Sequence, residues 1–264
     1  AKNQSLVVAD PDFDFTPSQP VDLSEVSVAT NSRRSAELQN IKWTPLPGTA
    51  KEGRFISELI EAELLLKGEA TSLALLSVKS PHILHIATHS YFQPNLELDH
   101  ADMASRFWSD NNSRSKQSFE NPLLRSGIVL SGANYPEDNP TDDGYLTALE
   151  FASMDLRGTQ MVVVSGCESG MGDVFAGEGV YGLKRAIAVA GAQSTLLSLW
   201  KVDDRATAAF MKDFYTFLEN GLAKDKALSL TQSKFRDHPI PLWREPYVWA
   251  AFQLTGNPGP ISGF

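Results

Sequence analysis

Runs of consecutive apolar and β-branched residues mark the segments that we expect to form strands. They occur at 6–8, 82–87, 128–130, 161–164 and 194–199. Continuous apolarity, as opposed to strict alternation, is typical of strands that are covered on both faces, as in a mostly parallel sheet. The pattern therefore predicts a buried sheet with helices on both sides.

Apolar residues at helical spacing predict the helices. The segments with this spacing are 55–66, 181–190, 206–218 and 227–235. The four aromatic residues Trp243, Tyr247, Trp249 and Phe252 follow them, and they favour a covering or edge strand over a ligand cage. Strands and helices alternate along the chain, which indicates the α/β class.

Two stretches do not fit this core. Residues 11–48 hold five of the fifteen prolines, and residues 93–122 are mostly polar. We interpret both as surface excursions, and 93–122 as an insertion or lid. Since no internal repeat is visible, we expect residues 1–264 to form a single domain, as part of a longer protein.

Composition narrows the class of partner. With 23 basic and 32 acidic residues the net charge is -9, which argues against nucleic acid and anionic membranes and favours basic or neutral partners. No segment approaches the roughly 18 apolar residues that span a bilayer, and the first residues lack the layout of a signal peptide. We expect a soluble, cytoplasmic protein.

The chain has one cysteine, Cys167. A single cysteine cannot form an internal disulfide or a multi-thiolate zinc site, and its being single favours a reducing compartment. A lone cysteine is often a buried small hydrophobe. However, Cys167 follows the strand 161–164 and His89 follows the strand 82–87, so in a parallel sheet both lie at the edge where sites assemble. An imidazole there can take the thiol proton and so activate the sulfur as a nucleophile.

The turn around Cys167 suits this chemistry. Its small residues (165–170, SGCESG) let main-chain amides approach a reacting carbonyl as oxyanion donors. The amide of Cys167, after Gly166, is the first candidate donor, and an amide at Ser90 is the second.

Three segments together resemble the CHAT domain of the caspase and separase clan. They are HIATHS at 85–90, the stretch that begins SGCESG at 165–207 and YVWAAFQLTG at 247–256, and LVVADPDF and LPGT near the start add to them. The resemblance implies a three-layer αβα sandwich of the caspase-hemoglobinase type with a mostly parallel sheet. It also implies that His89 is the base and Cys167 the nucleophile. Ser90 stands where the family usually has glycine, and Gly166 where it usually has alanine.

The resemblance also implies that an acidic residue after Trp200 selects the substrate. Asp204 would hold arginine or lysine in a charge-assisted pair. Asp203 and Glu168 are further candidate groups beside the substrate, and for Glu168, which directly follows Cys167, a hydrogen bond that fixes the loop stays open as the alternative. From the residues alone, Asp203 or Asp204 is equally suited to cap the helix that begins near Arg205. For Asp204 the two roles stay open, and for Asp203 the cap is favoured.

Other candidate sites are weaker. The pattern G-x-G-x-x-G at 177–182 does not directly follow a strand, as dinucleotide binding requires. Because residues alternate faces on a strand, His82 and His85 cannot converge with His89 on a metal, and we expect both to be buried and hydrogen-bonded. His238 would fit an α/β-hydrolase, but that nucleophile motif fails here by one position.

We therefore predict a cysteine endopeptidase with a His89–Cys167 dyad that cleaves after basic residues, without metal or organic cofactor. The alternative is a catalytically silent interaction or signalling module. CHAT relatives are often joined to tetratricopeptide repeats and act in bacterial regulated proteolysis. The resemblance thus implies a protein substrate and a repeat region or regulatory partner outside this chain.

Overall fold

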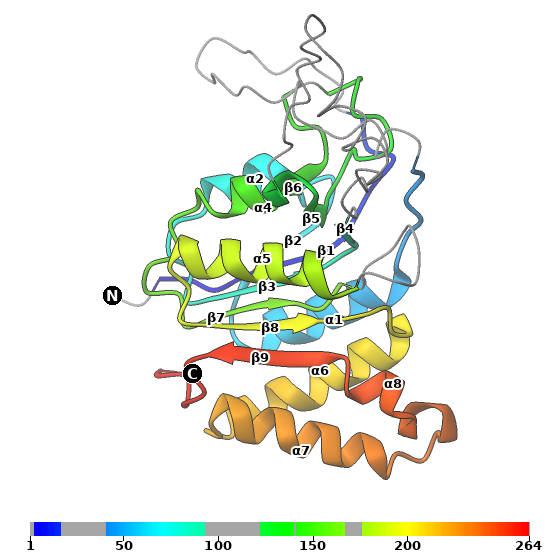
Figure 1. Ribbon diagram of the computed structural model, residues 1–264, viewed down its shortest axis with the longest axis vertical. Helices are drawn as coiled ribbons and strands as arrows, with labels where there is room; N and C mark the ends of the chain where they lie inside the picture. Colours follow the sequence, from blue (N-terminus) through cyan, green and yellow to red (C-terminus); the bar gives the residue numbers. More distant parts are fainter. Residues whose placement is uncertain (1–2, 17–40, 93–121, 140, 167–175, 264) are drawn as a thin grey trace, which may run out of the picture.

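The central layer is a twisted sheet. The computed structural model describes residues 3–16, 41–92, 122–139, 141–166 and 176–263. Among these residues, strands run in the spatial order β2-β1-β3-β7-β8-β9 (Figure 1). Their bounds are β1 Leu6–Pro11, β2 Glu63–Lys67, β3 Ile83–Ala87, β7 Met161–Val164, β8 Ser194–Ser198 and β9 Phe252–Gly256. β9 is antiparallel to β8, and the other neighbours are parallel.

Helices cover both faces of this sheet, as Figure 1 shows. On one face lie α2 (Ser72–Ser77), α4 (Ala148–Phe151) and α5 (Ala176–Ala190), and on the other lie α1 (Pro47–Leu59), α6 (Asp204–Glu219) and α7 (Lys224–Arg236). Neighbouring strand residues belong to different cores: Leu6 and Val8 pack on the α5 side, and Val7 on the α6 side. The predicted three-layer αβα sandwich with a mostly parallel sheet is confirmed.

A small antiparallel sheet stands beside the central one. It consists of β4 (Ser90–Phe92), β5 (Ser126–Val129) and β6 (Tyr145–Thr147) in the order β4-β5-β6. The run 128–130 is buried as expected, but it contributes to this second sheet. Assigning it to the parallel core was wrong, because apolarity reports burial and does not identify the pairing partner.

The predicted helix 55–66 is too long. α1 ends at Leu59, Glu61 adopts a φ of 51°, and the chain then enters β2. β2 lies at the edge of the sheet and is half-buried, so its leucines continue the apparent helical spacing although they belong to a strand. The predictions for α5, α6 and α7 are confirmed.

The C-terminal part closes the sheet. The 3-10 helix η4 (Pro241–Arg244) and helix α8 (Pro246–Trp249) lead into β9; a further 3-10 turn, η3, spans Pro122–Leu124. The expected edge strand is thus β9, and its first residue, Phe252, stacks on Phe210 at a centroid distance of 4.2 Å. Tyr247, from the same aromatic group, is 59% exposed and does not pack on the sheet. Within the described helices, none combines the length and apolarity that crossing a membrane would need.

Replacing Phe210 tests this packing. Its ring is fully buried between Phe252 and Phe235. Phe210→Ala is expected to lower the free energy of unfolding by about 3–5 kcal/mol, because a large cavity opens between α6 and β9. Phe217→Ala, on the same helix but half-buried, should cost less than half as much. Urea denaturation of both variants measures the difference, and equal losses would contradict this account of the core.

Candidate active site

The ends of β3 and β7 lie against each other. Ile86 pairs with Val164, and the amide of Ser165 donates to the carbonyl of Ile86 at 3.0 Å. One step further, a Cβ placed on Gly166 would lie 1.5 Å from the carbonyl oxygen of Thr88. Thr88, which precedes His89, therefore contacts Gly166, which precedes position 167. Cys167 and Glu168 themselves lie outside the described residues.

His89 is held in one orientation. Its side-chain Nε2 donates to the carbonyl oxygen of Thr44 at 2.8 Å. The rings of Phe13 and Trp43 each have their centroids 5.3 Å from that of the imidazole, and His89 is 6% exposed. Because Nε2 carries the proton in this bond, the neutral ring has its basic lone pair on Nδ1.

The surroundings of His89 favour the neutral form. Burial lowers the pKa of the imidazole below its ordinary value, and the positive charge of Lys201 acts in the same direction. The hydrogen bond to Thr44 opposes both effects and raises the pKa, because the carbonyl oxygen stabilises the charged imidazolium. A neutral imidazole is the state that can accept a proton.

The main chain on either side of His89 is fixed by β5. The Thr88 hydroxyl donates to the carbonyl of Val129 at 2.6 Å, and the Val129 amide donates to the carbonyl of His89 at 2.9 Å. Ser90 begins β4 and lies opposite Ile128 in a non-hydrogen-bonded pair. Its amide therefore points away from β5.

The two adjacent aspartates have different contacts. Asp203 is the N-cap of α6, since its Oδ1 accepts from the amides of Arg205 and Ala206 at 3.1 and 3.0 Å. Asp204 reaches across to α1 and accepts from the amide of Gly48. Asp203 thus holds the cap position, while the Asp204 carboxylate joins the N-terminal ends of two helices.

The Asp204 carboxylate stands in an acidic environment. Burial raises its pKa above the ordinary value, and the Gly48 amide opposes this. Nearby negative charges raise the pKa further, in decreasing order Glu52, Asp203 and Asp10. Of these, Asp10 lies near the C-terminal end of β1, and its Oδ2 is 2.7 Å from Nζ of Lys67. Burial is the largest of these effects, and together with the nearby charges it disfavours the ionised carboxylate although the Gly48 amide stabilises it.

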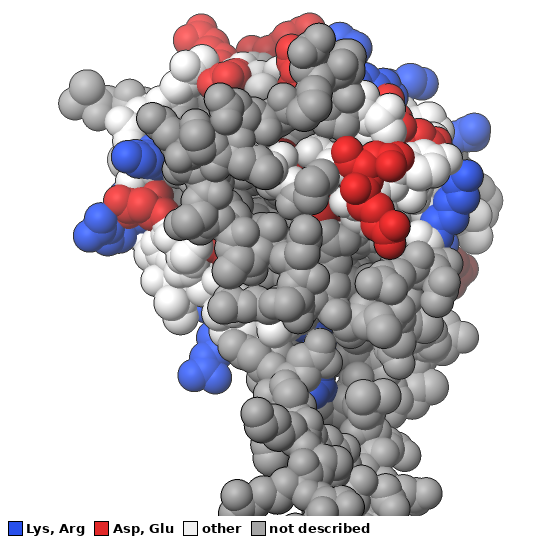
Figure 2. Space-filling model, turned by 90° about the horizontal axis from the view of Figure 1, so that it is seen from above, with Lys and Arg blue, Asp and Glu red and all other residues white. Residues whose placement is uncertain are grey.

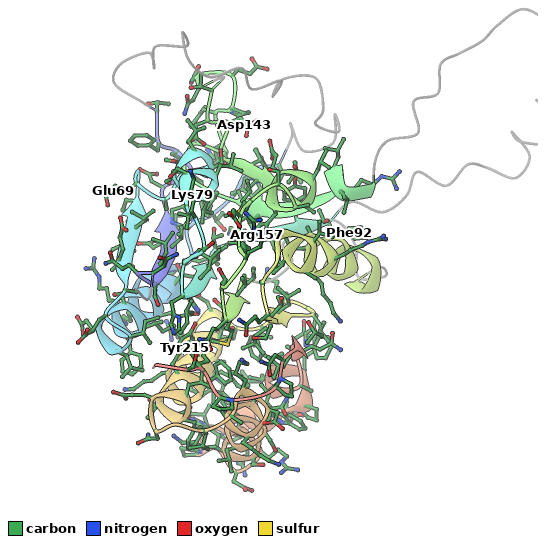
Figure 3. The ribbon with its side chains drawn as sticks, turned by 90° about the vertical axis from the view of Figure 1, so that its left-hand side faces the viewer. Glu69, Lys79, Phe92, Asp143, Arg157 and Tyr215 are labelled. Carbon is green, nitrogen blue, oxygen red and sulfur yellow. The ribbon has the colours of Figure 1, made fainter. Side chains whose placement is uncertain are left out.

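His85 belongs to a buried network away from His89. Its Nε2 lies 3.0 Å from Oε1 of Glu52, and its Nδ1 lies 3.1 Å from the hydroxyl of Tyr215. Figure 3 shows Tyr215 where α6 meets the sheet. Burial, with the charge of Glu52, raises the pKa of Tyr215 well above its ordinary value. The network ties α1 and α6 to β3, so the expectation of a buried, hydrogen-bonded His85 is confirmed.

The structure also places two candidates that the sequence analysis had ranked lower, the G-x-G-x-x-G pattern and His238. Residues 177–182, with the G-x-G-x-x-G pattern, lie within α5, which begins at Ala176, so the pattern does not form a strand-to-helix turn. His238 follows α7, accepts from the amide of Ile240 and packs against Trp243 at a centroid distance of 4.6 Å.

Sequence reasoning missed the residues that orient His89. Thr44 and Trp43 lie in the proline-rich stretch that was interpreted as a surface excursion, yet Trp43 is buried. Phe13 also lies in that stretch and is buried. The available signal was the presence of aromatic residues, Phe13, Phe15 and Trp43, in an otherwise mostly polar stretch, since exposed excursions seldom carry them.

Comparison with known proteins gives a consistent result. The family model described as CHAT domain matches residues 1–257. Over 230 residues the chain is 29% identical to human "Tetratricopeptide repeat protein 28", and over 238 residues it is 30% identical to the mouse protein of that name. Each alignment covers 84% of this chain and 9% of the relative, so the chain corresponds to a small part of a much longer protein.

Gly166→Ala tests the contact between the two strand ends. Because its Cβ would overlap the Thr88 carbonyl oxygen, one of the two backbones must shift, and we expect a loss of about 1–3 kcal/mol in the free energy of unfolding. Gly259→Ala is the control, since its Cβ would meet a flexible side-chain atom of Asn257 at 3.1 Å. Thermal and urea unfolding measure both variants, and a Gly166→Ala protein as stable as the control would disprove the contact.

Proposed function

Since the chain belongs to the CHAT domain family, we propose that it is a cysteine endopeptidase in which Cys167 is the nucleophile and His89 the general base. The observation that carries the proposal is the contact between Gly166 and Thr88, the residues that precede Cys167 and His89. With His89 fixed through Nε2, its Nδ1 is the nitrogen that would accept the thiol proton. The family relationship alone supports the coarser statement of a caspase-like, peptidase-related domain.

The proposed reaction has two stages. The thiol proton passes to Nδ1 of His89, and the sulfur attacks the carbonyl carbon of the scissile bond. The imidazolium then protonates the leaving amine, and the carbon–nitrogen bond breaks to give a thioester. Water, deprotonated by the same imidazole, hydrolyses the thioester and restores the thiol. The amides of Cys167 and Ser90 are the proposed oxyanion donors.

The proposed preference is for a basic residue before the scissile bond. Asp204 is the central group, with Glu168 and the charge of Asp203 as further candidates. A bound guanidinium would offset the repulsion that Asp204 experiences from Glu52 and Asp10. On the face seen in Figure 2, acidic side chains gather in patches among the basic ones. The net charge of -9 also suits a basic substrate.

The alternative proposal is a catalytically silent module. It draws support from the names of the two relatives, which refer to tetratricopeptide repeats and not to a peptidase. In either case, we propose that a tetratricopeptide-repeat region of a longer protein recruits the target or regulates this domain.

Peptide cleavage separates the two proposals. Fluorogenic peptides that end in Arg, Lys, Asp or Leu are incubated with the wild type, Cys167→Ala, His89→Ala and the control His238→Ala. We expect cleavage after Arg or Lys, a fall in kcat of at least about 10³-fold for the two dyad variants, and no change for the control. Equal turnover by wild type and Cys167→Ala would refute the peptidase. If no peptide is cleaved and Cys167 does not react with an electrophilic peptide, the silent module is supported.

Asp204→Asn tests the selectivity without breaking the fold. The amide keeps an acceptor for Gly48 and removes a charge that burial and the nearby acidic groups disfavour, the two effects that raise the pKa of Asp204. Stability at pH 7 should therefore stay equal or rise, while kcat/KM for Arg and Lys peptides falls about 10- to 100-fold. Asp213→Asn is the control, because it also removes a carboxylate from α6, one that pairs with Lys234 at 2.6 Å and has no proposed contact with the substrate. Unchanged selectivity in Asp204→Asn would assign Asp204 a structural role.

A further inference from the structure

Asn134 lies in the loop between β5 and β6 and joins three segments that are distant in sequence. Its amide donates to the carbonyl of Phe13 at 2.9 Å. Its Nδ2 donates to Oδ1 of Asp14 at 2.8 Å and to the carbonyl of Trp43 at 3.0 Å. A half-buried asparagine with this many contacts connects the segment after β1, the segment before α1 and its own loop.

The side chain of Asn134 holds both polar backbone groups of Trp43. Oδ1 accepts from the Trp43 amide at 2.8 Å, while Nδ2 donates to the Trp43 carbonyl. This two-way pairing is what a neighbouring strand would provide, and it fixes the peptide that joins Trp43 to Thr44. The next carbonyl along the chain, that of Thr44, is the acceptor for His89.

Both aromatic rings beside His89 therefore depend on Asn134. It holds Phe13 through its main chain and Trp43 through its side chain, and these two rings pack on the imidazole at the same centroid distance, 5.3 Å. The indole of Trp43 is fixed further by Tyr145, whose hydroxyl accepts from Nε1 at 2.8 Å.

From this arrangement we infer that Asn134 is a positioning residue for the general base: it sets the Thr44 carbonyl and the two rings that orient the His89 imidazole. The inference rests on the proposed peptidase function for its kinetic consequence, although the orientation of His89 can be measured without catalysis. Asn134 does not touch the reacting atoms in this account and acts through Trp43, Thr44 and Phe13.

The test compares three variants of this chain. Asn134→Ala removes the whole side-chain clamp, and Asn134→Asp keeps the size and the acceptor but replaces the donor to Trp43 with a carboxylate oxygen. Asn139→Ala is the matched control, because Asn139 fixes the same loop through the carbonyl of Asp142 and does not contact Trp43. Nitrogen-15 NMR of the His89 ring reports the fraction of the Nε2–H tautomer, and peptide kinetics report kcat and KM separately.

We expect the Nε2–H fraction to fall in both Asn134 variants and to stay at the wild-type value in Asn139→Ala. For a wild type that cleaves peptides, kcat should fall about 10- to 100-fold in the Asn134 variants, with KM within about twofold. An unchanged tautomer in Asn134→Ala, or an equal change in Asn139→Ala, would overturn the inference even if the wild type is an active peptidase. A tautomer change in a chain that cleaves no peptide, and whose Cys167 does not react with an electrophilic peptide, would instead support the inference and reject the proposed function.

Discussion

The parallel pairing of β3 with β7 is the constraint on which the rest of the structure depends. Parallel neighbours end at the same edge of a sheet, so the chain leaves both strands side by side. Gly166 allows this to continue beyond the last ladder bond, because its lack of a side chain lets the backbone meet the Thr88 carbonyl. His89 and the chain that leads to Cys167 start from this one contact.

The buried sheet and its order of elements could be predicted because they depend on local patterns. Apolar runs report burial, and helical spacing reports α5, α6 and α7. Local patterns failed where two structures share one pattern. β2 continues the apolar spacing of α1, and the run 128–130 is as apolar as a central strand although β5 pairs with β4 and β6. In both cases the pairing partner decides the structure, and a sequence window does not contain it.

The residues of the candidate site likewise divide into those that local sequence could predict and those that it could not. His89 and Cys167 were predicted because each follows a strand and because the segments around them resemble the CHAT domain. The residues that orient His89 gave no comparable signal, since Thr44 is 45 residues away in sequence and Asn134 is 91 residues from Trp43. An asparagine that clamps a backbone looks, in sequence, like any loop asparagine. Asp204 shows a further limit: its contact with Gly48 joins two helices, and neither the cap nor the pocket hypothesis contained that contact.

The enclosure of the imidazole has a consequence for when the site can form. Its walls come from residues after β1, before α1 and after β5, and those contacts close long loops. Each such contact must offset the entropy of closing a long loop, which local structure does not have to do. The orientation of the base is therefore a property of the assembled domain, and a short peptide that contains only the strand end with His89 would lack it.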